Sequence, residues 1–215
     1  AGLVVPAAVR SALLPVLGAA RHRPTHHRRE MHTAMDLCFG LLPFGLFGGY
    51  LIMRIFAPLA FPTEYLDGTH GASSVDVFTV LLAGWGLTLL ATPTYTSLMA
   101  GPYPWRFTLF ILLVLTAAVV LGYTLIVLGP AEPGHRLFAA AVASSLSAGV
   151  LLLLSWRMSG GMDFVRERQD DWALALLGMG FVVIGLNSGT HWWLLGLPLF
   201  LFTRRGWQAV RATLD

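Results

Sequence analysis

The sequence predicts an all-α integral membrane protein with about six membrane helices, preceded by an arm at the membrane surface. Three observations predict it: 56% of the residues are hydrophobic, only 12% are charged, and the apolar stretches are long and continuous. Soluble domains carry about 25% charged residues, so a water-exposed globule is not expected. Continuous apolar runs favour helices over a β-barrel, whose strands alternate between apolar and polar residues.

Residues 1–34 are predicted to form a cytoplasmic or interfacial arm. Residues 1–20 are apolar but contain Pro6, Arg10 and Pro15. This composition favours an interfacial helix or an extended segment on the membrane surface, with a retained signal-like segment as the alternative. Residues 21–32 are basic and rich in histidine. The arginines expected to bind lipid headgroups or a partner are Arg21, Arg23, Arg28 and Arg29.

The membrane domain is predicted to cover residues 35–207, with a cytoplasmic tail at 208–215. Each of the first four predicted spans has about the 20 residues that cross a bilayer; they are 35–56, 75–99, 105–128 and 136–156. The last apolar region, 172–203, contains a turn at 187–190 that divides it into 172–186 and 191–203. These two segments are short, so a re-entrant hairpin is the alternative to two crossings. The predicted spans form three successive hairpins.

The arginines predict the orientation of the chain. All fourteen basic residues are arginine, and with the N-terminus in the cytoplasm only Arg54 and Arg136 fall on the outer side. A single span over 172–203 would place Arg204 and Arg205 outside, against the positive-inside rule. We therefore expect both termini in the cytoplasm and the chain in a bacterial inner membrane. Tryptophan supports the same arrangement, since indole prefers the headgroup boundary; the predicted interfacial residues are Trp105, Trp156, Trp172, Trp192, Trp193 and Trp207.

Small residues predict where helices pack. Gly45 and Gly49 form a GxxxG motif in the first span, and Ala140, Ser144 and Ala148 share one face of the fourth. Such faces allow close approach of helix backbones in lipid. The partner is either another helix of this chain or a helix of another protein.

Histidines are the main candidates for ligand binding. His22, His26 and His27 have the HxxxHH spacing of membrane di-iron enzymes, but such sites need about eight histidines and this chain has seven. The surrounding arginines repel a cation, so a headgroup-binding arm is the preferred interpretation. His191, beside two tryptophans, is a candidate axial ligand of a haem or chlorophyll-type pigment, with interfacial capping of the last segment as the alternative.

Two polar patterns also have competing interpretations. Thr88, Thr92 and Thr96 follow one face of the second span and either line a polar path or bond within the helix bundle. The outer loop with Glu64, Asp67, His70 and Asp76 either binds a cation or is simply solvated, and Asp76 also suits the first turn of a helix.

Missing residues exclude several functions. Lysine is absent, which excludes a retinal Schiff base, and the single Cys38 excludes an internal disulfide and a CxxCH haem attachment. No phosphate-binding loop or hydrolase motif is present, and no basic face suits nucleic acid.

We therefore expect a non-enzymatic accessory subunit of a larger respiratory or photosynthetic membrane complex. Its expected partners are other integral membrane subunits and phospholipids, with no nucleic acid. No cofactor is required, although a lipid, pigment or haem at a shared interface is left open. A small transporter or channel, using the threonine face with Tyr123 and Thr124, is the main alternative, and a metalloenzyme built on the histidine cluster is the third.

Overall fold

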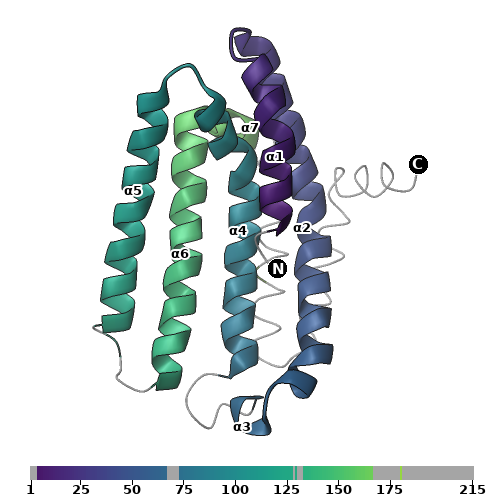
Figure 1. The fold of residues 1–215 in the computed structure, drawn as a ribbon, viewed down its shortest axis with the longest axis vertical. Helices are drawn as coiled ribbons and strands as arrows, with labels where there is room; N and C mark the ends of the chain where they lie inside the picture. Colours follow the sequence, from purple (N-terminus) through teal and green to yellow (C-terminus); the bar gives the residue numbers. More distant parts are fainter. Residues whose placement is uncertain (1–3, 67–72, 128, 130–132, 167–179, 181–215) are drawn as a thin grey trace, which may run out of the picture.

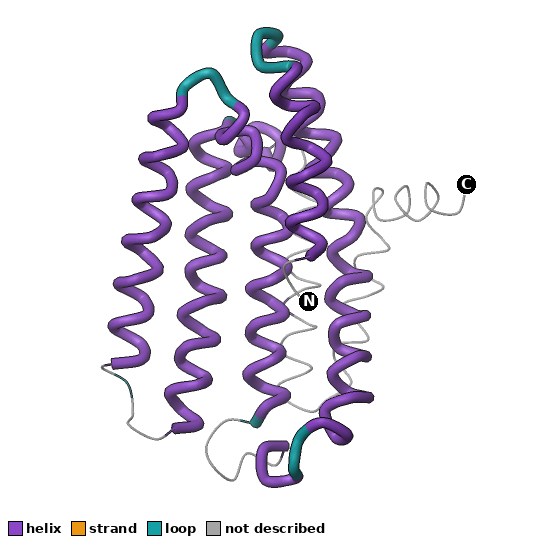
Figure 2. The backbone as a smooth tube through the Cα atoms, viewed as in Figure 1, coloured by secondary structure: helices purple, strands orange, loops and turns teal. Residues whose placement is uncertain are grey.

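The computed structural model describes residues 4–66, 73–127, 129, 133–166 and 180, and the regular structure in these residues is entirely helical (Figures 1 and 2). This confirms the predicted all-α class. The elements are α1 (Val4–Ala19), α2 (Pro24–Ala60), α3 (Thr63–Leu66), α4 (Ser74–Ala100), α5 (Pro104–Gly122), the π-helical turn η1 (Tyr123–Val127), α6 (Pro133–Ser159) and α7 (Gly161–Arg166).

Three described helices are long and apolar enough to cross a membrane: Ser74–Ala100, Trp105–Val127 and Gly134–Ser159. They coincide with the predicted spans 75–99, 105–128 and 136–156. The predicted first span, 35–56, lies inside α2, where Gly48–Ala60 is a shorter apolar stretch. The predicted segments 172–186 and 191–203 lie outside the described residues, so the six crossings and the third hairpin stay predictions.

Local sequence signals explain where the helices begin and end. At the start of α4, the Ser73 hydroxyl accepts a hydrogen bond from the Asp76 backbone N–H (3.1 Å), and the Asp76 carboxylate accepts one from the Ser73 N–H (3.2 Å). This capping box satisfies two N–H groups of the loop and first turn. α2 and α5 each begin with proline in the first turn, where no N–H is needed. α2 ends at Ala60, and the extended backbone of the following Phe61 is the conformation favoured before Pro62.

α4 is the centre of the bundle. It packs most extensively against α6, and also against α2 and α1, while α5 lies at the edge and packs mainly against α6 (Figure 1). Side chains from α1, α2, α4, α6 and α7 share one hydrophobic core, which includes Leu17, Met35, Leu89, Leu152 and Phe164. Each of these five side chains is at most 5% exposed.

The N-terminal region, predicted to form an arm at the membrane surface, folds into α1 and the first turns of α2. α1 lies alongside α4 and the first part of α2 (Figure 1), and Leu17 is fully buried in the shared core. α2 also runs without a break across the predicted boundary between residues 34 and 35. The physical reason is that no proline or glycine interrupts residues 25–39, and the buried Met31, Met35 and Cys38 repeat at helical spacing across that boundary.

Small residues bring α4 and α6 together. A Cβ added to Gly84 would lie 2.6 Å from the Ser145 Oγ and 3.0 Å from its Cα, and the Ser145 hydroxyl donates to the Val80 carbonyl (2.6 Å). Ser145 shares this face of α6 with Gly149, where an added Cβ would lie 3.9 Å from Leu87, and with the buried Ala141.

The predicted face of α6, with Ala140, Ser144 and Ala148, is displaced by one residue from this contact, and Ser144 is exposed. One residue turns a helix by about 100°, so a stripe of small residues that is two residues wide does not reveal which half packs. The GxxxG glycines of α2 face α4: Gly45 lies against the Trp85 ring and Gly49 against Leu82.

Candidate functional site

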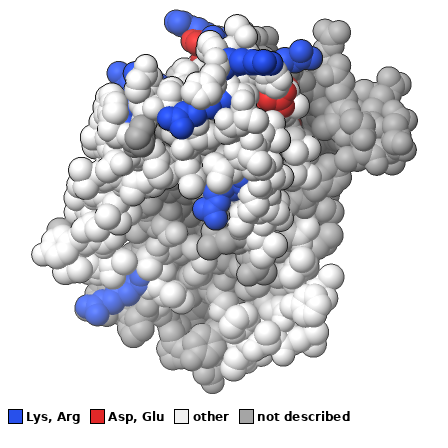
Figure 3. Space-filling view, turned by 45° about the horizontal axis from the view of Figure 1, so that its top comes forward, with Lys and Arg blue, Asp and Glu red and all other residues white. Residues whose placement is uncertain are grey.

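Three connections meet at one end of the bundle: residues 20–23 between α1 and α2, 101–103 between α4 and α5, and the turn at 160 before α7 (Figure 1). We call this the arginine-rich end, because arginine side chains gather there in the space-filling view (Figure 3). A guanidinium N–H of Arg21 donates to the Pro102 carbonyl (3.1 Å), and Arg28 forms an ion pair with Asp163 (2.9 Å). These contacts join three segments that the arginine pattern predicted to share one side of the membrane.

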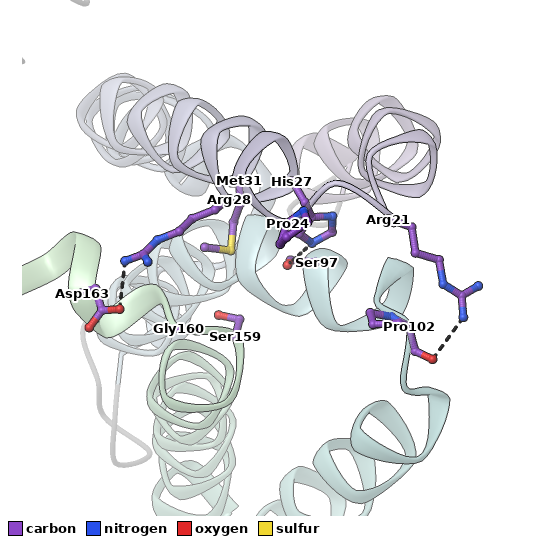
Figure 4. A pocket seen from close by; sticks show the side chains of 10 residues that line it. All are labelled: Arg21, Pro24, His27, Arg28, Met31, Ser97, Pro102, Ser159, Gly160 and Asp163. Atoms are coloured by element: carbon purple, nitrogen blue, oxygen red, sulfur yellow. Dashed lines mark hydrogen bonds and ion pairs between the residues drawn. The ribbon is translucent and has the colours of Figure 1, made fainter.

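A cleft of about 280 Å³ opens at the arginine-rich end, between the first turns of α2 and the ends of α4 and α6 (Figure 4). Figure 4 shows Arg28 and Arg21 pointing to opposite sides of it, with His27 and Ser97 between them. Its lining residues are Arg21, Pro24, His27, Arg28, Met31, Ser97, Pro102, Ser159, Gly160 and Asp163.

His27 connects three helices at the cleft. Its Nδ1 lies 3.1 Å from the Leu17 carbonyl oxygen of α1, and its Nε2 lies 2.7 Å from the Ser97 hydroxyl of α4. A carbonyl only accepts, so Nδ1 carries the proton; in the neutral ring, Nε2 then accepts from Ser97. Leu17 lies in the last turn of α1, where carbonyls lack a partner within the helix. His27 therefore acts as a cap for α1 and as a link to α4.

The cleft has a positive balance of charge. Arg21 and Arg28 line it with one carboxylate, that of Asp163. The Arg28–Asp163 pair is half exposed or more, with 50% and 61% of the two side chains accessible. Exposed ion pairs contribute only about 0–1 kcal/mol, so this pair opens at little cost. The cleft is therefore able to offer two guanidinium groups to an anion.

The predicted arm residues have different environments. Arg23 and Arg29 are exposed, as are His22 and His26, and His26 lies 3.6 Å from the carboxylate of Glu30. His27, in contrast, turns inward to Ser97. Within the described residues, no group of three or more His, Cys, Asp and Glu side chains could hold a metal ion. The HxxxHH spacing therefore does not bring its three histidines together around a common point.

The threonine face of α4 bonds within its own helix. Thr88, Thr92 and Thr96 each donate to the carbonyl four residues earlier, at 2.9, 2.8 and 2.6 Å. Thr92 and Thr96 are fully buried. This geometry corresponds to the structural interpretation of the pattern, in which serine and threonine hydroxyls bond to carbonyls of the preceding turn. Tyr123 and Thr124, the other residues considered for a polar path, are exposed on η1.

The described tryptophans of the predicted interfacial set divide into two classes. Trp105 is 60% exposed at the arginine-rich end, with the Arg106 guanidinium 5.6 Å from its ring centroid, which suits a headgroup boundary. Trp156 is only 6% exposed and belongs to the hydrophobic core. The reason is that the chain folds back after α6, and Gly161 packs close to the Trp156 Cα. The remaining members, Trp172, Trp192, Trp193 and Trp207, lie outside the described residues, as do His191, Asp67 and His70.

Comparison with protein-family models, with curated proteins and with solved structures found no match to this chain. Its site is therefore described from its own residues. Sequence reasoning named Arg21, Arg28 and His27 as members of the arm, but it missed Ser97, Ser159 and Asp163. The only signal for these three residues was their position near predicted cytoplasmic ends of spans. Serine and aspartate are common at helix ends, so this position does not single them out. Which of them meet in the cleft depends on the packing of α2, α4 and α6.

Proposed function

We propose that this chain is a non-catalytic accessory subunit of a larger bacterial membrane complex, respiratory or photosynthetic, which it stabilises through helix packing and its basic N-terminal region. The observation that carries the proposal is the surface of α5. Large apolar side chains are exposed along this helix from its first turns to its end; they include Leu109, Ile111, Leu112, Leu113, Leu115, Val119 and Val120. In the most apolar 18 residues of Trp105–Val127, which covers α5 and η1, only 6% of the residues are buried.

An exposed apolar helix in a membrane is covered by lipid or by another helix. Helix association in lipid depends on close packing, since lipid tails are as apolar as leucine. α5 is held to the described bundle mainly along α6, and its other sides are available to a partner. An accessory subunit needs such a surface.

The interior supports the same function. Its buried hydroxyl groups bond within the bundle, as in the Thr94–Ser155 pair (2.8 Å) between α4 and α6. The buried side chains of the described core are otherwise apolar or small. Most of the charged side chains visible in Figure 3 gather at the arginine-rich end. Such a distribution suits a protein that acts through contacts at its surface and not through a site in its interior.

The test is purification of the tagged chain from its native membrane in a mild detergent, followed by mass spectrometry of the co-purifying chains. We expect a defined set of integral membrane partners at fixed stoichiometry. The matched variants are Leu112→Trp and Leu112→Met, at a side chain that is 59% exposed. Lipid accommodates the larger tryptophan, whereas a packed helix does not. Leu112→Trp should therefore release partners that Leu112→Met retains.

A monodisperse chain that leaves the native membrane alone would contradict the proposal. Retention of the partners by both Leu112 variants would show that this face of α5 is not the contact. Solute flux in liposomes that contain only this chain would favour the transporter alternative.

A further inference from the structure

We propose that the cleft at the arginine-rich end binds the phosphate group of an anionic phospholipid. Its size suits a small polar group: at about 280 Å³ it lies at the lower limit of ligand pockets, which are about 300–1,000 Å³. The site requires only that the chain lies in a membrane. It does not require the accessory role, so the two proposals fail independently.

The donors match the chemistry of a phosphate. Arg21 uses one guanidinium nitrogen on the Pro102 carbonyl, and guanidinium has five N–H groups, so most remain for a ligand. Arg28 extends to Asp163 on the opposite side of the cleft (Figure 4), and because this ion pair is exposed, its guanidinium can turn toward a phosphate in the cleft. The Ser159 hydroxyl accepts from the Gly161 N–H (3.3 Å) and keeps its own hydrogen for donation, as far as the described contacts extend. Phosphate oxygens accept from all three groups.

The electrostatic field in the cleft is positive and also favours a phosphate. Pro24, in the first turn of the 37-residue α2, lines the cleft, and no side chain caps this helix N-terminus. The positive end of the helix dipole thus adds to the two guanidinium groups. Asp163 is the one carboxylate in the lining, and it is paired with Arg28. A bound phosphate competes with the Asp163 carboxylate for Arg28, so Asp163 weakens phosphate binding.

The surroundings favour a lipid over a free ion. Met31, Pro24 and Pro102 give the cleft an apolar part, which suits the glycerol and first acyl carbons beside a headgroup. Tyr103 and Trp105, both more than half exposed, follow directly after Pro102. Exposed aromatic rings of this kind mark the headgroup level of a membrane. A phosphate held at the same level is most simply that of a lipid.

The experiment measures lipid binding to the full chain in uncharged detergent by native mass spectrometry. The probes are phosphatidylglycerol, the zwitterionic phosphatidylcholine and inorganic phosphate. We expect tighter binding of phosphatidylglycerol, with an affinity that falls about tenfold or more in the double variant Arg21→Gln/Arg28→Gln, because two charge-assisted contacts are lost. The matched controls are Arg29→Gln, next to Arg28 but outside the lining, and Arg157→Gln, exposed at the last turn of α6. Each control should change the affinity less than about twofold.

Asp163→Asn gives a test that misfolding cannot imitate. Removal of the competing carboxylate should raise the affinity for phosphatidylglycerol, by about twofold or more. Equal affinity for the two lipids, equal losses in Arg28→Gln and Arg29→Gln, or weaker binding in Asp163→Asn would each overturn the proposal. Inorganic phosphate that binds the lipid-free chain as tightly as phosphatidylglycerol does would keep the phosphate chemistry but overturn the lipid as its source.

Discussion

His27 shows how one side chain determines the arrangement of three helices. Its two ring nitrogens lie within hydrogen-bond distance of the Leu17 carbonyl and the Ser97 hydroxyl. The carbonyl belongs to the last turn of α1, and the hydroxyl belongs to a buried position of α4. Without the imidazole, both part-buried groups would need new partners. The adjacent His26, although identical in type, lies exposed beside Glu30.

We expect His27→Ala to lower the free energy of unfolding by about 1–3 kcal/mol, because the mutation leaves part-buried polar groups without partners. The measurement is unfolding in mixed detergent micelles, followed by circular dichroism. His26→Ala is the matched control, and as a surface change it should stay within about 0.5 kcal/mol of wild type. Similar losses in both variants would show that the His27 contacts contribute nothing specific.

At the scale of the helices, the contact between α4 and α6 depends on the lack of a side chain at Gly84. The Ser145 backbone and hydroxyl occupy the space that a Cβ would need. The hydroxyl is held there by its bond to the Val80 carbonyl. Because the obstacle includes a Cα atom of α6, it cannot move away without moving that helix. The contact is therefore close and hard to relax.

A series of glycine substitutions tests this contact. We expect Gly84→Ala to cost about 1–3 kcal/mol of stability by overpacking. Gly48→Ala is the control: nothing lies within 4 Å of its added Cβ, and alanine favours a helix by up to about 1 kcal/mol over glycine. Gly49→Ala should fall between them, because the obstacle there is the flexible end of Leu82. The same unfolding measurement gives the order, and a neutral Gly84→Ala would show that α4 and α6 are not in this close contact.

The start of α4 gives a second prediction at this scale. Ser73→Ala removes the acceptor for the Asp76 N–H and should cost about 0.5–2 kcal/mol, the usual value of an N-cap. Ser73→Thr keeps a hydroxyl at the cap and should retain most of the stability, whereas Ser74→Ala, inside the helix, should have little effect. Amide hydrogen exchange in the first turn of α4 would locate the change. Unchanged exchange in Ser73→Ala would mean that the capping box does not hold this turn.

At the scale of the whole molecule, the sequence predicted the bounds of the three described spans but not how the helices pack together. The predicted spans 75–99, 105–128 and 136–156 nearly coincide with α4, α5 with η1, and α6. The reason is that glycine and proline at 101–104 and 129–134 interrupt long apolar runs. Hydropathy does not show which helices pack together, so the packing of α1 against α4 could not be predicted from the sequence. Trp156 likewise has an interfacial sequence position, but α7 folds back beside it.

The cleft illustrates the same limit. Its arginines were identified because charge is visible in the sequence, whereas its serines and Asp163 depend on three helices ending at one level. Composition fixes which end of a span is basic. Only the tertiary structure decides which basic residues converge on a common space.

The length of α2 gives the last prediction, because this helix joins the two ends of the bundle. Its 37 residues extend about 55 Å at 1.5 Å per residue, well beyond a hydrocarbon core of about 30 Å. Thr25 at its start and Thr63 just past its end are both exposed, and the native Cys38 is buried. We expect a membrane-impermeant maleimide to label Thr63→Cys on intact cells and Thr25→Cys only after lysis, since the positive-inside rule places the arginine-rich end in the cytoplasm. The wild-type chain, which has only Cys38, is the control for background labelling. Labelling of Thr25→Cys on intact cells would invert the orientation and would place the cleft at the outer leaflet.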